Sequence, residues 1–355
     1  MRPLTARIHI GALRHNLEVV KAHAPRSRVW AVVKANAYGH GVRRAAKALA
    51  SADGLALLEL DAALDLRAAG EARPILLLEG FFSPRELPDI ASNRLTIVVH
   101  SLEQIAMLEK AQLQQKIAVY LKLNTGMNRL GLNEKSFRTA LARLQACGCT
   151  GDITLMTHFA DAGTGESVRL QMERFKAVTS GSTLARSLAN SAAILRFPET
   201  HADWVRPGIM LYGCSPFSNQ SAEALGLRPA MSLVSELIAV HELGAGEGIG
   251  YGWTFTTPAP MRVGVIACGY ADGYPRHAPT GTPIIVAGKR TRTVGLVSMD
   301  MLFADLTGIP NAVVGSTVFL WGERVSADEV AASAGTVSYE LLSKLGQRVP
   351  ISEVE

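Results

Sequence analysis

Short apolar runs alternate with helical segments through the first part of this 355-residue chain, and this rhythm constrains the fold more than any other feature. Eight runs, each ending at a polar or glycine residue, lie at residues 29–34, 54–59, 74–79, 95–100, 117–124, 152–158, 187–190 and 204–212. Unbroken Val, Ile and Leu runs are typical of strands buried on both faces. Eight of them with helical crossovers predict a (β/α)8 barrel of the TIM type. An open doubly wound sheet stays possible, although it usually has fewer strands.

Helices are expected before and between these runs, near residues 11–24, 40–52, 60–69, 83–91, 102–113, 134–147 and 167–181. In a barrel of this type the active site lies where the strands end. The polar residues at or near the ends of the apolar stretches in the eight runs are Lys34, Glu59, Glu79, His100, Lys122, His158, Asn190 and Arg206. We therefore expect a ring of polar side chains at one end of the barrel.

After Gly213 the pattern changes. A loop-like segment at 214–229 precedes β-type runs at 231–243, 261–268, 283–287, 293–299 and 317–321, with short helices expected at 327–334 and 339–345. Glycine and proline between these runs indicate a second, predominantly antiparallel β domain. We place the barrel at residues 1–225, with its first few residues packing on the β domain, and the second domain at 226–355.

The composition narrows the class of function. The net charge of +5 is dispersed, without a basic run interleaved with aromatics, so neither nucleic acid nor a membrane surface is an expected partner. We find no signal-peptide pattern and no apolar stretch long enough to span a bilayer. The four cysteines form no CxxC pair and no zinc-type spacing. We therefore expect reduced thiols, no metal site and a cytoplasmic location.

Lys34 stands at the end of the first run, where small residues and glycines follow. The amine of a lysine at the end of a buried strand can be desolvated, which lowers its pKa and leaves it nucleophilic enough to form an imine. A lysine that leaves the core and extends to water would occupy the same position. The position alone does not decide between these roles.

Alternating glycines at residues 244–252 surround Tyr251. They do not form GxGxxG and no helical pattern follows, so a dinucleotide site is not indicated. A strand end or hairpin with close backbone approach fits the pattern better. Tyr251 is then either a packing aromatic or a side chain presented for chemistry.

A series of short motifs resembles, in order, those of bacterial alanine racemases, which are pyridoxal-phosphate enzymes of fold type III. They are residues 32–41 (VVKANAYGHG), 122–131 (KLNTGMNRLG), 157–160 (THFA), 190–192 (NSA), 205–209 (VRPGI), 250–252 (GYG), 269–274 (GYADGY), 298–301 (SMDM) and 338–340 (SYE). The similarity extends over both predicted domains.

The resemblance implies a site for pyridoxal 5'-phosphate (PLP). Its residues would be Lys34, Tyr38, His158, Asn190, Ser191, Arg206, Gly208, Ile209 and Tyr339. Lys34 would bind the cofactor covalently, and small residues around Gly208 would let backbone N–H groups reach the phosphate. Arg206 would face the pyridine nitrogen. Because arginine can only donate hydrogen bonds, that nitrogen would stay unprotonated.

Racemisation needs a base and an acid on opposite faces of one carbon. By resemblance, Lys34 serves one face and Tyr251 of a second subunit serves the other. A free tyrosine has a pKa of about 10, so it must be activated by nearby positive charge. A symmetric homodimer with two shared active sites is therefore expected.

The resemblance also assigns the substrate contacts. Arg129 and the backbone N–H of Met299 would bind the carboxylate of the amino acid. Lys122 is similar to a family lysine that is often carbamylated, which would orient Arg129. Tyr270, Asp300 and Arg276 would support the site and its entrance.

Two positions depart from the family pattern. Gly163 stands where an acidic residue is usual, and Leu296 stands where an arginine is usual. Both line the outer entrance in relatives, so we expect substrate selection or the rate of substrate entry to differ from that of a strict alanine enzyme.

The resemblance implies interconversion of L- and D-alanine, which supplies D-alanine for peptidoglycan or consumes it in catabolism. A racemase of broader specificity, acting for example on serine, is the alternative. A decarboxylase on the same two-domain plan would put an acidic residue on the pyridine nitrogen, and Arg206 argues against it. A non-catalytic PLP-binding barrel would lack the β domain that carries Tyr251.

Overall fold

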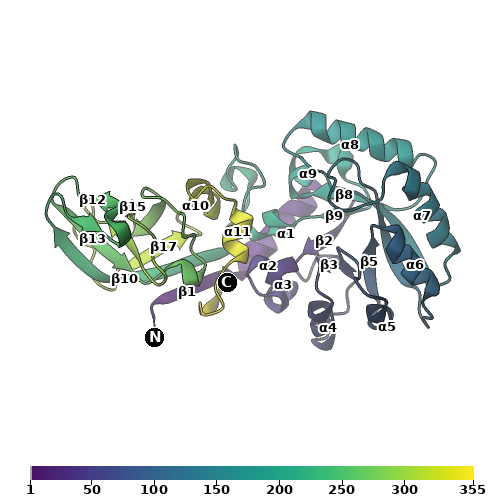
Figure 1. The fold of residues 1–355 in the computed structure, drawn as a ribbon, viewed down its shortest axis with the longest axis horizontal. Coiled ribbons are helices and arrows are strands. Elements are labelled where there is room, and N and C mark those ends of the chain that lie inside the picture. The colour runs from purple at the N-terminus through teal and green to yellow at the C-terminus, as the bar shows by residue number, and fades with distance from the viewer. Residues whose placement is uncertain (1) are drawn as a thin grey trace.

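The computed structural model describes residues 2–355 and contains two domains (Figure 1). In this view a barrel surrounded by helices lies on the right and a sheet domain on the left. None of the helices within residues 2–355 combines the length and apolar character needed to cross a bilayer. The two domains meet at the helices α1 (Ile10–His23), α2 (Lys34–Tyr38) and α11 (Ser338–Ser343), and the candidate site lies beside α2 and α11.

Eight parallel strands close into a barrel. They are β2 (Arg28–Val32), β3 (Gly54–Leu57), β4 (Ile75–Leu77), β5 (Leu95–Val99), β6 (Ile117–Lys122), β7 (Thr150–Met156), β8 (Arg186–Asn190) and β9 (Trp204–Arg206). Pairing of β2 with β9 completes the ring. The strands are largely buried, as unbroken apolar runs require. The predicted barrel is thus confirmed, and the open sheet is not adopted.

Helices cover the outside of the barrel between successive strands (Figure 1). They are α3 (Val42–Ala48), α4 (Leu60–Ala68), α5 (Leu87–Ser92), α6 (Leu102–Lys110), α7 (Glu134–Ala146), α8 (Gly165–Val178) and α9 (Ser191–Arg196), and α1 (Ile10–His23) precedes the first strand. The helix expected at 83–91 is instead a 3-10 turn, Pro84–Glu86, followed by α5. Ser83 and Glu86 form a capping box at the start of this 3-10 turn.

The first strand ends earlier than expected, because β2 stops at Val32 and Lys34 begins the short turn α2 (Lys34–Tyr38). Ala35, Asn36, Ala37 and Tyr38 all have φ between 51° and 54°, so this turn is left-handed. Such a turn costs roughly 1–2 kcal/mol per non-glycine residue. The buried His40 stabilises it, because its Nδ1–H donates to the carbonyl oxygens of Ala37 (3.0 Å) and Tyr38 (2.9 Å).

The second domain is built on one sheet with the order β13-β16-β15-β14-β17-β10-β1-β18. The strands are β1 (Leu4–His9), β10 (Met231–Leu243), β13 (Met261–Ile266), β14 (Pro283–Val286), β15 (Lys289–Val294), β16 (Leu302–Asp305), β17 (Thr317–Trp321) and β18 (Ile351–Val354). The long β10 pairs with both β13 and β17, so six of these strands pair in a closed ring. Apart from the parallel pair β1–β18, the strand pairings described in this sheet are antiparallel, which confirms the predicted class.

The N-terminal strand belongs to this sheet and not to the barrel. β1 pairs with β10 over Leu4↔Ser235 to Ile8↔Met231, and with β18 on its other side. The chain then enters the barrel through α1 (Figure 1). Both ends of the chain therefore contribute strands to the second domain.

The strand expected at residues 293–299 is wrong in its bounds. β15 runs over Lys289–Val294, and the chain leaves it at Gly295, where φ is +69°. Residues 295–301 are a loop that carries Met299, and β16 begins only at Leu302. The apolar pattern of the sequence extends into this loop because Val297 is buried there. It does not indicate a continuing strand.

The hairpin interpretation of the glycine-rich segment is confirmed. The two-residue strands β11 (Gly248–Ile249) and β12 (Phe255–Thr256) pair with each other. The 3-10 turn Tyr251–Trp253 joins them. Tyr251 is therefore displayed at the tip of a hairpin.

We predict that Gly213→Ala destabilises the protein by more than about 2 kcal/mol. Gly213 follows the 3-10 helix Ile209–Tyr212 with φ of +75°, and an added Cβ would lie 1.8 Å from the carbonyl oxygen of Arg228. Gly226→Ala is the matched control, because its φ is +71° but an added Cβ would meet no atom of the described residues within 4 Å. It should cost only about 1 kcal/mol. Thermal unfolding of both variants measures the difference, and equal costs would contradict the steric argument.

Candidate active site

A cavity of about 860 Å³ opens at the ends of the barrel strands, and both domains contribute to its wall. The predicted residues that line it are Lys34, Tyr38, Lys122, Arg129, His158, Asn190, Ser191, Arg206, Gly208 and Ile209 from the barrel, and Tyr339 from α11 (Ser338–Ser343). Of the eight strand-end residues, Glu59 and His100 are absent from this wall. The barrel thus brings together residues separated by up to about 300 positions in the chain.

Positive charge dominates the cavity. Five cationic side chains line it, Lys34, Lys122, Arg129, Arg196 and Arg206, against the two carboxylates Glu79 and Asp161. Such a wall attracts an anionic ligand, and it also disfavours further protonation of its own bases.

The two lysines respond to this environment in the same direction. Burial, followed by the charge of Arg129, lowers the pKa of Lys34, while Glu79 and Glu59 oppose the shift. Burial, followed by Arg206 and Arg129, lowers the pKa of Lys122 to about 8. Both amines therefore have an increased neutral fraction near neutral pH, which is the nucleophilic form.

Arg206 is almost fully buried and is fixed at the end of β9. Its Nη1 donates to Ser187 Oγ (2.7 Å), and its Nη2 donates to the carbonyl oxygens of Thr157 (2.6 Å) and Leu188 (3.3 Å). Its Nε–H has no acceptor within residues 2–355 and is available to a ligand. Burial lowers the pKa of Arg206 to about 10, so the guanidinium stays protonated at neutral pH.

His158 stands beside this guanidinium, with Nδ1 3.5 Å from Arg206 Nη2. Burial first, and then the charges of Arg206 and Lys122, hold its pKa well below the usual 6.5. The imidazole is consequently neutral and can face an aromatic ring without adding charge.

A small space between α9 and the turn after β9 is surrounded by hydrogen-bond donors, and we call it the Ser191–Gly208 cradle. Ser191 Oγ accepts hydrogen bonds from the backbone N–H of Gly208 (2.9 Å) and of Met210 (3.5 Å), so its own proton is free to donate. A Cβ on Gly208 would lie 2.7 Å from the Tyr38 hydroxyl and would fill this space. The Ile209 N–H has no acceptor in the part of the chain that the structure describes.

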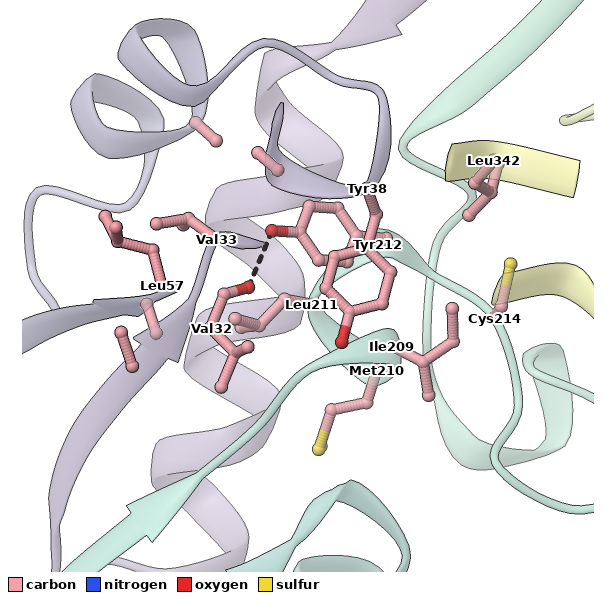
Figure 2. Packing of buried hydrophobic residues seen from close by; sticks show 14 of the residues in the cluster. Val32, Val33, Tyr38, Leu57, Ile209, Met210, Leu211, Tyr212, Cys214 and Leu342 are labelled. Atoms are coloured by element: carbon pink, nitrogen blue, oxygen red, sulfur yellow. Dashed lines mark hydrogen bonds between the residues drawn. The ribbon is translucent and has the colours of Figure 1, made fainter. Parts of the chain in front are cut away.

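The Tyr38 ring is held in place by a second tyrosine. Its centroid lies 4.5 Å from that of Tyr212 in a stacked arrangement. The Tyr212 hydroxyl in turn donates to the carbonyl oxygen of Val32 (2.8 Å), as Figure 2 shows. Burial raises the pKa of Tyr38 to about 12, so its hydroxyl stays a hydrogen-bond donor.

The remaining predicted residues do not reach this cavity within one chain. Tyr251, Tyr270, Met299, Asp300 and Arg276 all belong to the second domain, and none of them lines the wall. Tyr251 is 72% exposed and Met299 is 53% exposed. The structure of a single chain therefore leaves Lys34 without the predicted second base.

Sequence reasoning missed several residues of the cavity wall. The sequence marks Glu79 only as a strand end, and no pattern in it points to Asp161, Arg196 or Phe217. The Arg196 guanidinium stacks on the Phe217 ring, 3.3 Å from its centroid. Phe217 lies in the segment 214–229, which the sequence marks only as a loop, so no local pattern could have predicted this contact.

Comparison with known proteins agrees with this arrangement. The family model "Alanine racemase, N-terminal domain" matches residues 8–216, and "Alanine racemase, C-terminal domain" matches residues 230–352. The chain belongs to the alanine racemase family. An alanine racemase of Nitrosospira multiformis is 56% identical over 98% of each chain, and one of Paraburkholderia phytofirmans is 54% identical over 99% of each.

Solved structures of alanine racemases are similar over the whole chain. The biosynthetic alanine racemase of Pseudomonas aeruginosa has a TM-score of 0.98 and 46% sequence identity, with full coverage of both chains. The alanine racemase of Acinetobacter baumannii has a TM-score of 0.95 and 37% identity, again with full coverage of both. The similarity therefore covers the barrel, the sheet domain and their mutual arrangement.

We predict that His158 makes stability sensitive to mild acid. Because its pKa is lowered in the folded protein, the unfolded chain takes up a proton below pH 6.5 that the folded protein does not. This contribution is complete above pH 6.5 and is lost as the pH falls. Between pH 6.5 and 5, the free energy of unfolding of wild type should fall by about 1.5 kcal/mol more than that of His158→Asn.

Thermal unfolding of the two proteins across this range measures the effect. The comparison is repeated between pH 7.5 and 9, where the imidazole is neutral in both states and the difference should be constant. Parallel curves throughout would show that His158 is protonated as readily when folded as when unfolded.

Proposed function

We propose that this protein is a PLP-dependent alanine racemase that interconverts L- and D-alanine by a two-base mechanism. The observation that carries the proposal is the cavity in which Lys34, Arg206 and the Ser191–Gly208 cradle converge, in a chain of the alanine racemase family. Such an enzyme would act in the cytoplasm, either to supply D-alanine for peptidoglycan or to consume it in catabolism.

The residues present fit PLP in charge and in shape. The cradle in which a Cβ on Gly208 would meet the Tyr38 hydroxyl suits a phosphate, held by Ser191 and the N–H of Ile209. Lys34 would bind the cofactor covalently, and the free Nε–H of Arg206 would donate to its pyridine nitrogen. The neutral His158, together with Asn190 and Tyr339 on the cavity wall, would complete the contacts. When bound, the cofactor withdraws electrons from the α-carbon of the amino acid.

The chain's own residues would then move the proton. Lys34 Nζ, with its lowered pKa, would exchange a proton with one face of the α-carbon. Tyr251 of the partner subunit would exchange a proton with the opposite face. By family resemblance, Lys34 is the base for D-alanine and Tyr251 the base for L-alanine. Because Arg206 can only donate a hydrogen bond, the pyridine nitrogen would stay unprotonated and the cofactor would withdraw fewer electrons, which would limit side reactions such as transamination.

A partner subunit is needed because one chain places Lys34, but not Tyr251, in its own cavity. Tyr251, Trp253, Met299 and Met301 are exposed on the second domain, and such an apolar surface is typical of a protein interface. We propose a symmetric homodimer in which this surface reaches the partner's cavity. Two identical shared sites follow from the twofold symmetry.

Substrate binding would use the remaining cations. The Arg129 guanidinium and the Met299 N–H of the partner would hold the carboxylate of alanine. The pKa of about 8 leaves Lys122 partly neutral, so its amine could add to carbon dioxide and release one proton. The resulting carbamate would replace repulsion between Lys122 and Arg129 with attraction and would orient the guanidinium.

We predict that purified protein with PLP incorporates deuterium at the α-carbon of L-alanine in D2O while optical rotation is lost. Lys34→Ala should lose both this activity and the absorbance of the bound cofactor. Tyr251→Phe should keep the absorbance and lose turnover about 10²–10⁴-fold, as expected when one proton-transfer group is removed.

Tyr274→Phe is the matched control, since the buried Tyr274 hydroxyl has no hydrogen-bond partner among residues 2–355 and its loss should not affect turnover. Retention of the α-hydrogen in wild type would exclude racemisation. Normal racemisation by Tyr251→Phe would instead exclude only the two-base assignment.

The altered entrance carries a separate prediction about specificity. Asp161, two residues before Gly163, lines the cavity and its Oδ1 accepts a hydrogen bond from the Gly163 N–H (2.6 Å), so a carboxylate is still present there. Leu296 is partly buried in the second domain and brings no charge. Leu296→Arg should raise kcat/KM for alanine relative to serine and longer amino acids. An unchanged ratio would contradict a role for Leu296 in selection and would leave the serine alternative without support.

A further inference from the structure

Four charged residues from distant parts of the chain meet on the second domain: Arg2, Asp272, Asp300 and Arg348. We call them the terminal clamp, because Arg2 and Arg348 come from the two ends of the chain. The Asp272 carboxylate is completely buried. It accepts hydrogen bonds from Arg2 Nη1 (2.6 Å) and Nη2 (2.8 Å), from Arg348 Nε (2.7 Å) and from the Gly269 N–H (2.9 Å).

Both arginines also bind Asp300. Arg348 Nη2 donates to Asp300 Oδ1 at 2.6 Å, and Arg2 Nη2 donates to the Asp300 carbonyl oxygen. Asp300 directly follows Met299, and Asp272 lies two residues after Tyr270. The terminal clamp therefore joins the two segments that carry Tyr270 and Met299.

The same two segments are connected through their backbones. Tyr270 N–H donates to Ser298 O and Ala271 N–H donates to Met299 O, both at 3.0 Å. The segments approach so closely that a Cβ on Gly269 would lie 2.3 Å from the Met299 carbonyl oxygen. In contrast, the Met299 N–H has no acceptor within residues 2–355. The clamped loop pair thus carries the free Met299 N–H at an exposed position.

Burial alone would raise the pKa of Asp272, but hydrogen bonds from Arg2 and Arg348 outweigh it and lower that pKa. The carboxylate is therefore charged at all working pH values. A buried charge that loses one of its partners is destabilised, so each arginine is needed to keep this loop pair in one arrangement.

We propose that the terminal clamp positions the Met299 N–H and Tyr270 for substrate binding in the partner's active site. The inference rests on the proposed function, in which these groups act across the dimer. Arg2 and Arg348 touch neither substrate nor cofactor and are positioning residues. Since the Met299 N–H would hold the carboxylate and not the reacting carbon, loss of the clamp should weaken substrate binding more than it slows turnover.

The first test uses steady-state kinetics of the PLP-loaded dimer. Arg348→Met should raise KM for alanine roughly five- to tenfold with kcat within about twofold, as expected for lost uniform binding. Arg348→Lys, which can replace one of the donors, should give an intermediate KM. Arg292→Met removes an ion pair with Asp305 in the same domain (3.1 Å) and is the matched control, with an unchanged KM. A merely stabilising role would lower the unfolding temperature and leave KM unchanged, and that result would overturn the proposal.

The second test uses mixed dimers purified with two different tags. When an Arg348→Met subunit pairs with a Lys34→Ala subunit, the one live site combines intact Lys34 with the intact clamp of the other chain. Its KM should equal the wild-type value. When wild type pairs with a Lys34→Ala/Arg348→Met subunit, the only active site combines Lys34 of the wild-type chain with the disrupted clamp of the other chain. The KM of this site should be raised.

The outcomes separate the two hypotheses. A raised KM in the first mixed dimer would show that the clamp acts within its own subunit and would overturn the inference, while the proposed racemase function would stand. If wild type is active but both mixed dimers are inactive, the hypothesis that two chains share each active site is overturned. The inference then fails with it. Wild type that does not racemise alanine would overturn the proposed function itself.

Discussion

Positive charge gathered in one cavity is the constraint on which the rest of this structure depends. Lys34, Lys122, Arg129 and Arg206 line the same cavity, where their repulsion and partial burial oppose folding. The protein compensates most fully at Arg206, whose guanidinium donates to two carbonyl oxygens and the Ser187 hydroxyl. The lysines respond by holding their protons less tightly. An anionic cofactor and an anionic substrate would relieve the remaining repulsion, so the same charges that destabilise the free protein favour its ligands.

The backbone conformation after Lys34 also opposes folding, because it is strained. Four consecutive non-glycine residues adopt left-handed conformations directly after the lysine. His40, the stacked Tyr38 and Tyr212 rings and the packing of α11 against Gly39 hold this turn in place. Strain of this kind persists only where the surroundings determine the conformation, and it is concentrated at functional sites. Here it directs Lys34 and Tyr38, four positions apart in the chain, into the same cavity.

The different contributions of the two domains explain why Tyr251 and Met299 do not line the cavity of their own chain. The barrel supplies the cavity, while the sheet domain supplies the exposed hairpin tip at Tyr251 and the loop at Met299. Both ends of the chain return to the sheet domain, through the strands β1 and β18 and through Arg2 and Arg348. The surface that would meet a partner is thus tied to the chain termini and not to the barrel.

The sequence by itself determined the barrel, because strands buried on both faces must be apolar without interruption and eight such runs leave few other folds. It also predicted part of the cavity wall, since polar side chains at strand ends meet at one mouth, although Glu59 and His100 do not line it. Tertiary structure alone decided the left-handed turn after Val32, the end of β15 at Gly295 and the contact between Arg196 and Phe217. These depend on neighbours far away in sequence: His40 against two carbonyl groups, and a loop packed against a helix. The pairing of Arg2 and Arg348 with Asp272 is of the same kind, because no local pattern reveals which arginine will meet a buried carboxylate.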